Sequence, residues 1–111
     1  MKIAEQRQGD AVVLQPTGAI AGADAERLGQ RLAELAETTQ DRIVVDLAMV
    51  TQLDSAALEA LVDATERLIR SGRVLVLASP SELIQEVLEI MEVAPLFEQH
   101  DDLVLATGGR Q

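Results

Sequence analysis

The fold of this protein is decided by residues 42–58, which have the sequence RIVVDLAMVTQLDSAAL. Residues 43–45 are three consecutive β-branched residues, a run that predicts a strand covered on both faces. We expect this strand to emerge into water at Asp46. A short loop then leads to a helix that begins at Asp54 and Ser55. The stretch therefore predicts a central strand of an α/β sheet that is followed by a helix.

The helix after this loop has an amphipathic pattern. An Asp or Ser at a helix N-terminus pairs with free backbone N–H groups and is favoured by the helix dipole, so Asp54 and Ser55 are most simply a cap. Ser71-Gly72 supplies the left-handed residue on which helices often end. The apolar residues of the helix recur at i, i+1, i+4 spacing: Ala57, Leu58, Leu61, Val62, Leu68 and Ile69.

Length and composition bound the class of protein. A chain of 111 residues is large enough for one core and too short for two. The absence of cysteine excludes disulfides, thiolate metal sites and a thiol nucleophile, and fits an intracellular protein. We expect no signal peptide, because the N-terminus lacks a basic end and an apolar run. We also expect a soluble protein, since no apolar segment approaches the roughly 20 residues that span a bilayer.

The charge of the chain indicates the kind of partner. A formal net charge of −10 argues against nucleic acid or an anionic membrane as the main partner, and favours a basic protein. The negative charge is uneven, because there is no Lys or Arg from Val74 to Gly109. Phe97 is the only aromatic residue, so the stacking platforms that bind single-stranded nucleic acid are missing.

The residues before the central strand predict a hairpin and a helix. Strand-like residues 2–8 and 11–17 flank a turn-prone Gly-Asp pair at 9–10. We expect residues 17–23 to form a flexible connection. Behind Asp24, apolar residues repeat at helical spacing: Ala25, Leu28, Leu32, Leu35 and Ala36.

The residues after the second helix predict a strand and two more helices. Residues 74–78 read as another fully buried strand, and 79–82 as a helix start with Pro near the first turn. Leu96 and Phe97 are expected to fold back as core anchors. We favour a short helix over a brief strand for residues 101–106. The apolar face of the third helix is predicted to be Leu83, Ile84, Val87, Leu88 and Met91.

These elements follow the order β-β-α-β-α-β-α. Alternation of strands and helices in the second half calls for parallel crossovers. The predicted fold class is therefore α/β, a mixed four- to five-stranded sheet with helices packed mainly on one face. We place the domain at residues 1–106 and a disordered tail at 107–111.

The motifs together resemble the STAS domain family, the domain of bacterial anti-sigma-factor antagonists. The resemblance covers nearly the whole chain. It rests on residues 18–20 for the family's Gly-x-Leu/Ile, on 43–47 for its central strand with Asp-Leu, and on the Asp54 turn. It rests further on 74–78, on Ser79-Pro80-Ser81, on 87–89 and on 96–97. The resemblance implies a STAS-like fold and a protein that binds a partner protein.

The phosphorylation motif of the family is altered. In the sporulation and stress antagonists the motif resembles Asp-Ser-Ser-Gly-Leu, and its second Ser receives phosphate from the anti-sigma factor, a serine kinase. Ala56 stands at that position here, and Ala57 replaces the Gly. Ser55 directly follows Asp54, as the phosphate acceptor does in stressosome members of the family. The small STAS subunits of lipid-transport ATPases share this arrangement, and for them we expect no phosphorylation.

Three interpretations of Ser55 stay open: an N-cap, a phosphate acceptor, and an unmodified contact in a constitutive interface. A phosphate there adds about −1.5 to −2 charges, which the helix dipole tolerates. The fold should survive, and a partner that buries Ser55 against an apolar or acidic surface should lose affinity.

The second helix offers further partner-binding candidates. Ala56, Ala60 and Ala64 repeat every four residues, which favours close packing against the sheet, and alternatively a flat docking groove for a partner helix. Glu59 and Asp63 are like charges at i, i+4 spacing, so they are either solvated or face a basic partner. The candidate partner-binding set is Asp54, Ser55, Ala56, Glu59, Ala60 and Asp63, and the acidic stripe Glu82, Glu86 and Glu89 is a further candidate face.

We expect no enzyme, no cofactor and no metal site. There is no GxxxxGK loop and no Ser-His-Asp arrangement with a recognisable elbow. His100 is placed in a polar tail segment.

The leading hypothesis is a cytoplasmic, monomeric regulatory module that resembles an anti-sigma-factor antagonist. It binds an anti-sigma factor or serine kinase through the Asp54-Ser55 loop and the second helix, with Ser55 phosphorylation as the switch. The alternative is a non-catalytic STAS accessory subunit of an ABC-type lipid transport complex, whose Ser55 loop contacts the transporter ATPase. A third reading is a bare scaffold in a larger signalling assembly.

Overall fold

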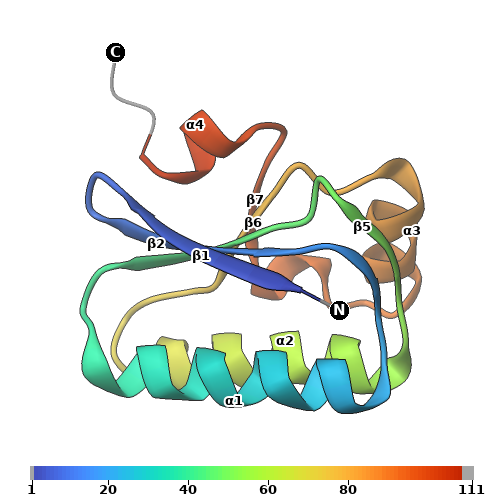
Figure 1. Ribbon diagram of the computed structural model, residues 1–111, viewed down its shortest axis with the longest axis horizontal. Coiled ribbons are helices and arrows are strands. Elements are labelled where there is room, and N and C mark those ends of the chain that lie inside the picture. The colour runs from blue at the N-terminus through green and yellow to red at the C-terminus, as the bar shows by residue number, and fades with distance from the viewer. Residues whose placement is uncertain (1, 109–111) are drawn as a thin grey trace.

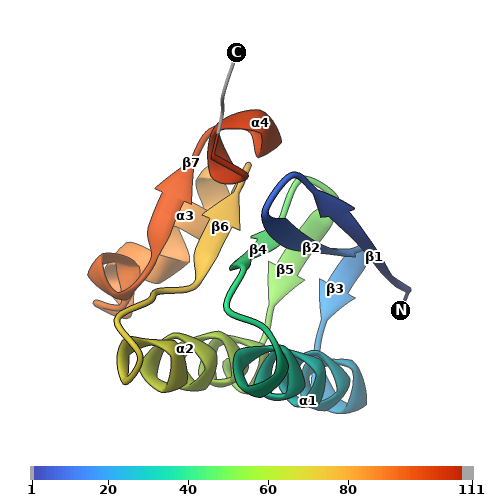
Figure 2. The same cartoon turned by 90° about the vertical axis from the view of Figure 1, so that its left-hand side faces the viewer.

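A computed structural model describes residues 2–108 of the chain (Figures 1 and 2). The elements follow the chain as β1 (Ile3–Gln8), β2 (Ala11–Pro16), β3 (Gly18–Ile20), α1 (Gly22–Thr38), β4 (Arg42–Asp46), β5 (Val50–Leu53), α2 (Ser55–Ile69), β6 (Val76–Ala78), α3 (Glu82–Ile90), the 3₁₀ turn η1 (Ala94–Leu96), β7 (Glu98–His100) and α4 (Leu103–Ala106).

The main sheet has five strands in the order β1-β2-β4-β6-β7. β1 pairs with β2 in antiparallel orientation, and the other neighbours are parallel. Figure 2 shows α1 and α2 side by side below the sheet and α4 above it. The predicted mixed α/β sheet, with helices mainly on one face, is confirmed.

Two hydrophobic clusters occupy the two faces of this sheet. The larger cluster joins one face of β2, β4 and β6 to α1, α2 and α3, while the smaller one lies on the other face and includes Ala106 of α4. In β4, Ile43 and Val45 belong to the larger cluster and Val44 to the smaller. Because side chains alternate along a strand, both sides of β4 are covered, as the β-branched run predicted.

The hairpin is confirmed, but the flexible connection predicted after it is wrong. Residues 18–20 form β3, which pairs in parallel with β5 as a separate two-stranded sheet. β5 itself lies inside the segment expected to be a short loop. Both strands are only three or four residues long, and each is stabilised by a partner about 30 residues away. Local sequence patterns carry no signal for such a non-local pair.

Asp46 is buried, contrary to the expectation that the central strand emerges into water there. Its carboxylate accepts a hydrogen bond from the Ala48 backbone N–H at 3.0 Å and another from Gln15 Nε2 at 2.9 Å. These two donors replace the water that the charged group loses on burial. Asp46 therefore closes the turn between β4 and β5 rather than marking the protein surface.

The ends of the first two helices are completed in different ways. α1 begins at Gly22, two residues before the predicted Asp24, and its N-cap residue Ala21 contributes no side-chain hydrogen bond. α2 ends as predicted, with Gly72 in a left-handed conformation at φ 77°. Arg73 then turns back to the end of α1, where its guanidinium donates to the carbonyl oxygens of Ala36 at 3.1 Å and Thr39 at 2.8 Å.

Several predicted core positions are exposed. Ile69 of α2 is half exposed, and only residues 76–78 of the predicted strand 74–78 pair, with Val74 on the surface. Ser81 caps α3 by accepting from the Ile84 N–H, and Pro80 directly precedes this cap, near the first turn as predicted. Of the predicted apolar face of α3, Ile84 and Leu88 are buried, and Leu83 and Met91 are exposed, because α3 lies at the edge of the fold.

The C-terminal segment contains a strand that the sequence did not reveal. Phe97 is buried as predicted, and Glu98–His100 then pairs with β6 as β7, so the prediction of His100 in a polar tail is wrong. The predicted short helix is confirmed as α4. Thr107 and Gly108 still donate hydrogen bonds to carbonyl oxygens of α4, and the remainder of the predicted tail, 109–111, lies outside the described residues.

Candidate functional site

The N-termini of α1 and α2 meet at one carboxylate, that of Asp54. The parallel pair β3 and β5 delivers both helices to the same end of the molecule, and the Asp54 N–H donates to the Ile20 carbonyl at 3.1 Å. Asp54 Oδ1 accepts from the Ala57 N–H at 2.8 Å, which is the predicted N-cap of α2. Asp54 Oδ2 accepts from the Gly22 N–H at 3.0 Å, so the same side chain also caps α1.

These backbone hydrogen bonds fix the charge state of the turn. Hydrogen bonds from Ala57 and then from Gly22 hold the pKa of Asp54 below its ordinary value, because both donors favour the ionised carboxylate. A negative charge at two helix N-termini also suits both helix dipoles. Asp54 is thus a structural anchor that positions the residues after it.

Ser55 and Ala56 are the first two residues of α2, and both are exposed. Ala57, at the position where the resembled motif has Gly, is fully buried. The cap of α2 is supplied by Asp54, so the Ser55 hydroxyl is presented at the surface beside the anchored turn. The turn therefore offers one exposed hydroxyl, at Ser55, and a methyl group where the family motif has its acceptor.

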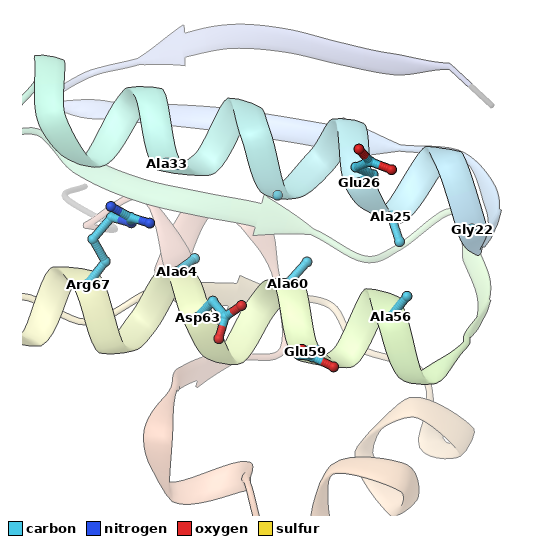
Figure 3. A pocket seen from close by; sticks show the side chains of 11 residues that line it. Gly22, Ala25, Glu26, Ala33, Ala56, Glu59, Ala60, Asp63, Ala64 and Arg67 are labelled. Carbon is cyan, nitrogen blue, oxygen red and sulfur yellow. The ribbon is translucent and has the colours of Figure 1, made fainter.

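A groove of about 380 Å³ runs between α1 and α2 (Figure 3). The two helices approach closely at its centre, where a side chain on Gly29 would meet the Ala60 methyl group at 3.3 Å. Figure 3 shows the methyl groups of α2 pointing toward α1 and the Arg67 side chain reaching across. The lining residues are Gly22, Ala25, Glu26, Gly29, Ala33, Ala56, Glu59, Ala60, Asp63, Ala64 and Arg67.

This groove brings together four of the six predicted partner-binding residues: Ala56, Glu59, Ala60 and Asp63. The alanine stripe was expected to pack on the sheet, but Ala56 and Ala60 face α1 instead, and Ala64 alone belongs to the core. Small residues line the groove and leave space between the two helices. The helices fit closely only where Gly29 of α1 faces Ala60 of α2. The stripe is thus both a packing surface and the floor of a groove.

Ser55 does not line this groove. With 3.6 residues per turn, Ser55 lies about 100° around α2 from Ala56, on the flank that also carries Val62. A group attached at position 56 would enter the groove, whereas one attached to Ser55 would project beside it. The alteration of the motif therefore moves the available hydroxyl to a different flank of α2.

α1 contributes residues to the groove that were not predicted from the sequence. Glu26 adds a third carboxylate to those of Glu59 and Asp63, while Arg67 lies 3.8 Å from Glu37 Oε1. A row of small residues in α1 was the available signal, since it faces the alanine stripe: Gly22, Ala25, Gly29 and Ala33. The groove has an apolar floor and a mainly acidic rim.

The remaining titratable candidates have structural partners. His100 Nε2 lies 2.6 Å from Glu98 Oε2, and Glu98 also pairs with Arg42. Arg42 Nε donates to the Ala106 carbonyl at 2.6 Å, so this cluster fastens α4 to the sheet. Within residues 2–108, no group of three or more His, Asp and Glu side chains is arranged to hold a metal ion. Nor does any helix of that part of the chain have the length and hydropathy to cross a bilayer.

A comparison with protein families matches the STAS domain model to residues 2–106. The chain belongs to the STAS domain family. A search of curated proteins found no match. The resemblance to this family that the motifs indicated is therefore confirmed.

Solved structures share the same fold. An anti-sigma-factor antagonist (STAS) domain protein from Planctomyces limnophilus is 18% identical, with a TM-score of 0.80 over 95% of this chain and 94% of that one. The phosphorylated form of the Bacillus cell fate determinant SpoIIAA is 13% identical, with a TM-score of 0.71 over 89% and 91%. A sulfate transporter family protein from Wolinella succinogenes is 19% identical, with a TM-score of 0.77 over 89% and 83%.

These similarities define the general class of this protein. At identities below 20%, the structural likeness shows the fold. Together with the family match, it shows that this chain is a STAS domain with the same fold as proteins described as anti-sigma-factor antagonists.

Proposed function

We propose that this STAS domain is a regulatory module that binds an anti-sigma factor of the serine-kinase type and thereby acts as its antagonist. The observation that carries the proposal is the exposed Ser55-Ala56 pair, held by the Asp54 anchor next to an open groove. The fold similarity to antagonists, SpoIIAA among them, supports the same conclusion. The docking surface comprises the Asp54-Ser55 turn and the exposed face of α2.

Charge complementarity favours a basic partner segment. Three carboxylates, of Glu26, Glu59 and Asp63, stand on the rim of the groove, and the chain as a whole carries a net charge of −10. A positively charged segment laid along α2 would be attracted to this rim, and its smaller side chains would contact the alanine floor. Acidic or nucleic-acid partners would be repelled by the same charges.

Phosphorylation of Ser55 is the proposed switch. The hydroxyl is exposed, so a kinase can reach it without unfolding the turn. A phosphate would add about −1.5 to −2 charges at a helix N-terminus beside the ionised Asp54 carboxylate. The dipole of α2 tolerates that charge, whereas a partner surface pressed against Ser55 would lose affinity through desolvation and repulsion.

The switch is tested by intact-mass measurement and peptide mapping of the protein purified from its native cell. Wild type and Ser55→Ala are compared under growing and stressed conditions, with Ser71→Ala, at an exposed serine after the other end of α2, as the matched control. We expect a phosphate adduct that is lost only in Ser55→Ala. Unmodified Ser55 under both conditions would contradict the switch.

The docking surface is tested by co-purification of the native partner with tagged protein. Ala56→Arg places a bulky positive charge in the groove at an exposed position, and Ala4→Arg places the same side chain on the exposed edge strand β1. The partner should be retained by Ala4→Arg and lost from Ala56→Arg. Equal retention by both variants would place the interface elsewhere. Light scattering of the isolated protein checks the monomer that we expect before a partner binds.

A second candidate function is a non-catalytic STAS accessory subunit of an ABC-type lipid transport complex. The specific observation in its favour is Ala56, which removes the usual phosphate acceptor, and one structural relative is a sulfate transporter family protein. In that case an ATPase and a permease would co-purify through the Ser55 turn, and Ser55 would stay unmodified. Co-purification of a serine kinase instead would favour the antagonist. Both proposals place the module in the cytoplasm.

A further inference from the structure

A second surface, separate from the α1–α2 groove, lies on α3. Three of the large apolar side chains that the fold leaves exposed belong to this short helix and its C-cap: Leu83 at 56% exposure, Ile90 at 71% and Met91 at 55%. Val87 lies between them and is partly buried. We call these four residues the α3 apolar row. Isolated exposed apolar residues are ordinary, but a row on successive turns of one helix forms a contiguous patch.

The spacing of the row suits another helix. Leu83, Val87 and Ile90 follow each other at intervals of four and three residues, which is the repeat of a coiled-coil seam. The neighbouring side of α3, about 100° around the helix from Leu83, is already occupied, because Ile84 and Leu88 are fully buried in the core of the domain. The row therefore faces away from the centre of the core and is available to a partner helix without any rearrangement of the fold.

The charges beside the row select the partner. Glu82, Glu86 and Glu89 are exposed along the adjacent flank of α3, and Glu92 follows the helix. The chain has no Lys or Arg between Val74 and Gly109 to neutralise them. A second copy of this domain would bring the same acidic row against this one, and an anionic membrane would also be repelled. A partner helix with Lys or Arg beside its own apolar seam would match both the α3 apolar row and the carboxylates beside that row.

We infer that α3 is a second docking site, which receives an amphipathic helix of a partner protein with basic residues flanking its apolar seam. The site does not depend on the proposed function of the Asp54-Ser55 turn, since the two surfaces share no residue. A partner that engages both would be held at two places. Occupation of α3 would also leave Ser55 and the groove free for another protein.

The probe is a synthetic 15-residue amphipathic peptide with leucines at the seam and lysines beside it, titrated into ¹⁵N-labelled protein. We expect saturable chemical-shift changes at α3 residues, and binding that weakens as salt is raised. Ile90→Ser and Leu83→Ser should each weaken binding about tenfold or more, because each removes a large apolar contact. Val104→Ser, at an apolar residue of α4 with 53% exposure, is the matched control and should bind as wild type does.

A charge exchange tests the specificity. Glu86→Lys should weaken the lysine peptide and improve binding of a peptide with glutamates in place of the lysines. Shift changes confined to the α1–α2 groove, or equal losses in Val104→Ser and Ile90→Ser, would overturn the proposal. Concentration-dependent dimers that Ile90→Ser abolishes would also overturn it, in favour of a second copy as the occupant. Circular dichroism of each variant verifies that the fold is retained.

Discussion

The two neighbouring helices α1 and α2 differ in how their ends are completed. α2 is self-sufficient, because Asp54 directly before it accepts from Ala57 and the left-handed Gly72 after it ends the helix. α1 has no side-chain cap of its own at Ala21. Its first N–H is instead paired with Asp54, and carbonyl groups at its far end accept from Arg73.

Both ends of α1 are thus completed by residues that flank α2. Helix ends carry unpaired backbone groups that need hydrogen-bond partners. Here Asp54 and Arg73, which flank α2, supply such partners to α1. Asp54 also caps α2. The arrangement fixes α1 along α2 in register, and so it positions the two helices that form the groove. This dependence has one direction. The ends of α2 are completed without α1, whereas the ends of α1 take hydrogen bonds from residues that flank α2. Substitutions at the residues that complete these helix ends test this asymmetry.

The largest effect is expected from Arg73→Ala. The guanidinium donates to three carbonyl oxygens, those of Ala36, Thr39 and Asp41, and the alanine leaves them unpaired. A loss of about 1–3 kcal/mol in the free energy of unfolding should follow, measured by urea denaturation. Arg70→Ala, at an exposed arginine three residues earlier, is the control and should stay within about 0.5 kcal/mol of wild type. Similar losses in both variants would contradict a special role for Arg73.

Asp54→Ala should give the next largest loss of stability, because it uncaps both helices at once. Asp54→Asn should lose less, since an asparagine oxygen still caps a helix but has only one acceptor atom. NMR chemical shifts should show the first turn of α1 disordered as well as that of α2. If the chemical shifts change only in the first turn of α2 in Asp54→Ala, the conclusion that Asp54 caps both helices is wrong.

The pH dependence of stability tests the contribution of the Asp54 carboxylate. Folding lowers the pKa of Asp54 from its ordinary 3.8, so its contribution is complete at neutral pH and is lost as pH falls through the lower folded value. Hydrogen bonds from Arg7 and Arg31 likewise lower the pKa of Asp41 and of Glu5. Wild type should therefore lose stability below about pH 4, with a shallower loss in Asp54→Asn. Parallel curves for the two proteins would argue against the contribution of Asp54.

The smallest effect on stability is expected from changes at Ser55. Ser55→Ala should leave the free energy of unfolding within about 0.5 kcal/mol of wild type, because the cap of α2 is Asp54. Ser55→Glu places a negative charge in the first turn of α2 and should raise stability by no more than about 1 kcal/mol. Thermal unfolding by circular dichroism measures both. A large loss in Ser55→Ala would show that the hydroxyl supports the turn.

The sequence predicted the fold well wherever the signal was local. The β-branched run at 43–45, the Gly-Asp turn of the hairpin and the apolar repeats of the helices each depend on neighbouring residues, and the structure confirms them. β3, β5 and β7 were missed because each is three or four residues long and acquires its structure from a distant partner strand. Asp46 was placed at the surface because its two donors come from a loop and from β2.

The candidate site was predictable on one helix only. The cap at Asp54 and the stripe along α2 follow from spacing within a single element. The second bond of Asp54, to Gly22, joins residues 32 positions apart, and the face of α1 that lines the groove becomes meaningful only once the two helices lie together. The exposed apolar positions of α3 were likewise not predicted, because apolar spacing shows that a face is hydrophobic without showing what covers it.

The strand connections described above also set the order in which the chain can fold. The β1–β2 hairpin is the single local pairing of the strands in residues 2–108, and every other pair is parallel and separated by a helix, η1 or a third strand. A hairpin forms in about 1–10 μs, whereas parallel pairs must first close longer loops. β7 and α4 are made after the other described elements, so a nascent chain exposes the edge of β6 until residues 98–106 emerge. We therefore expect the C-terminal segment to govern the final, slow step of folding.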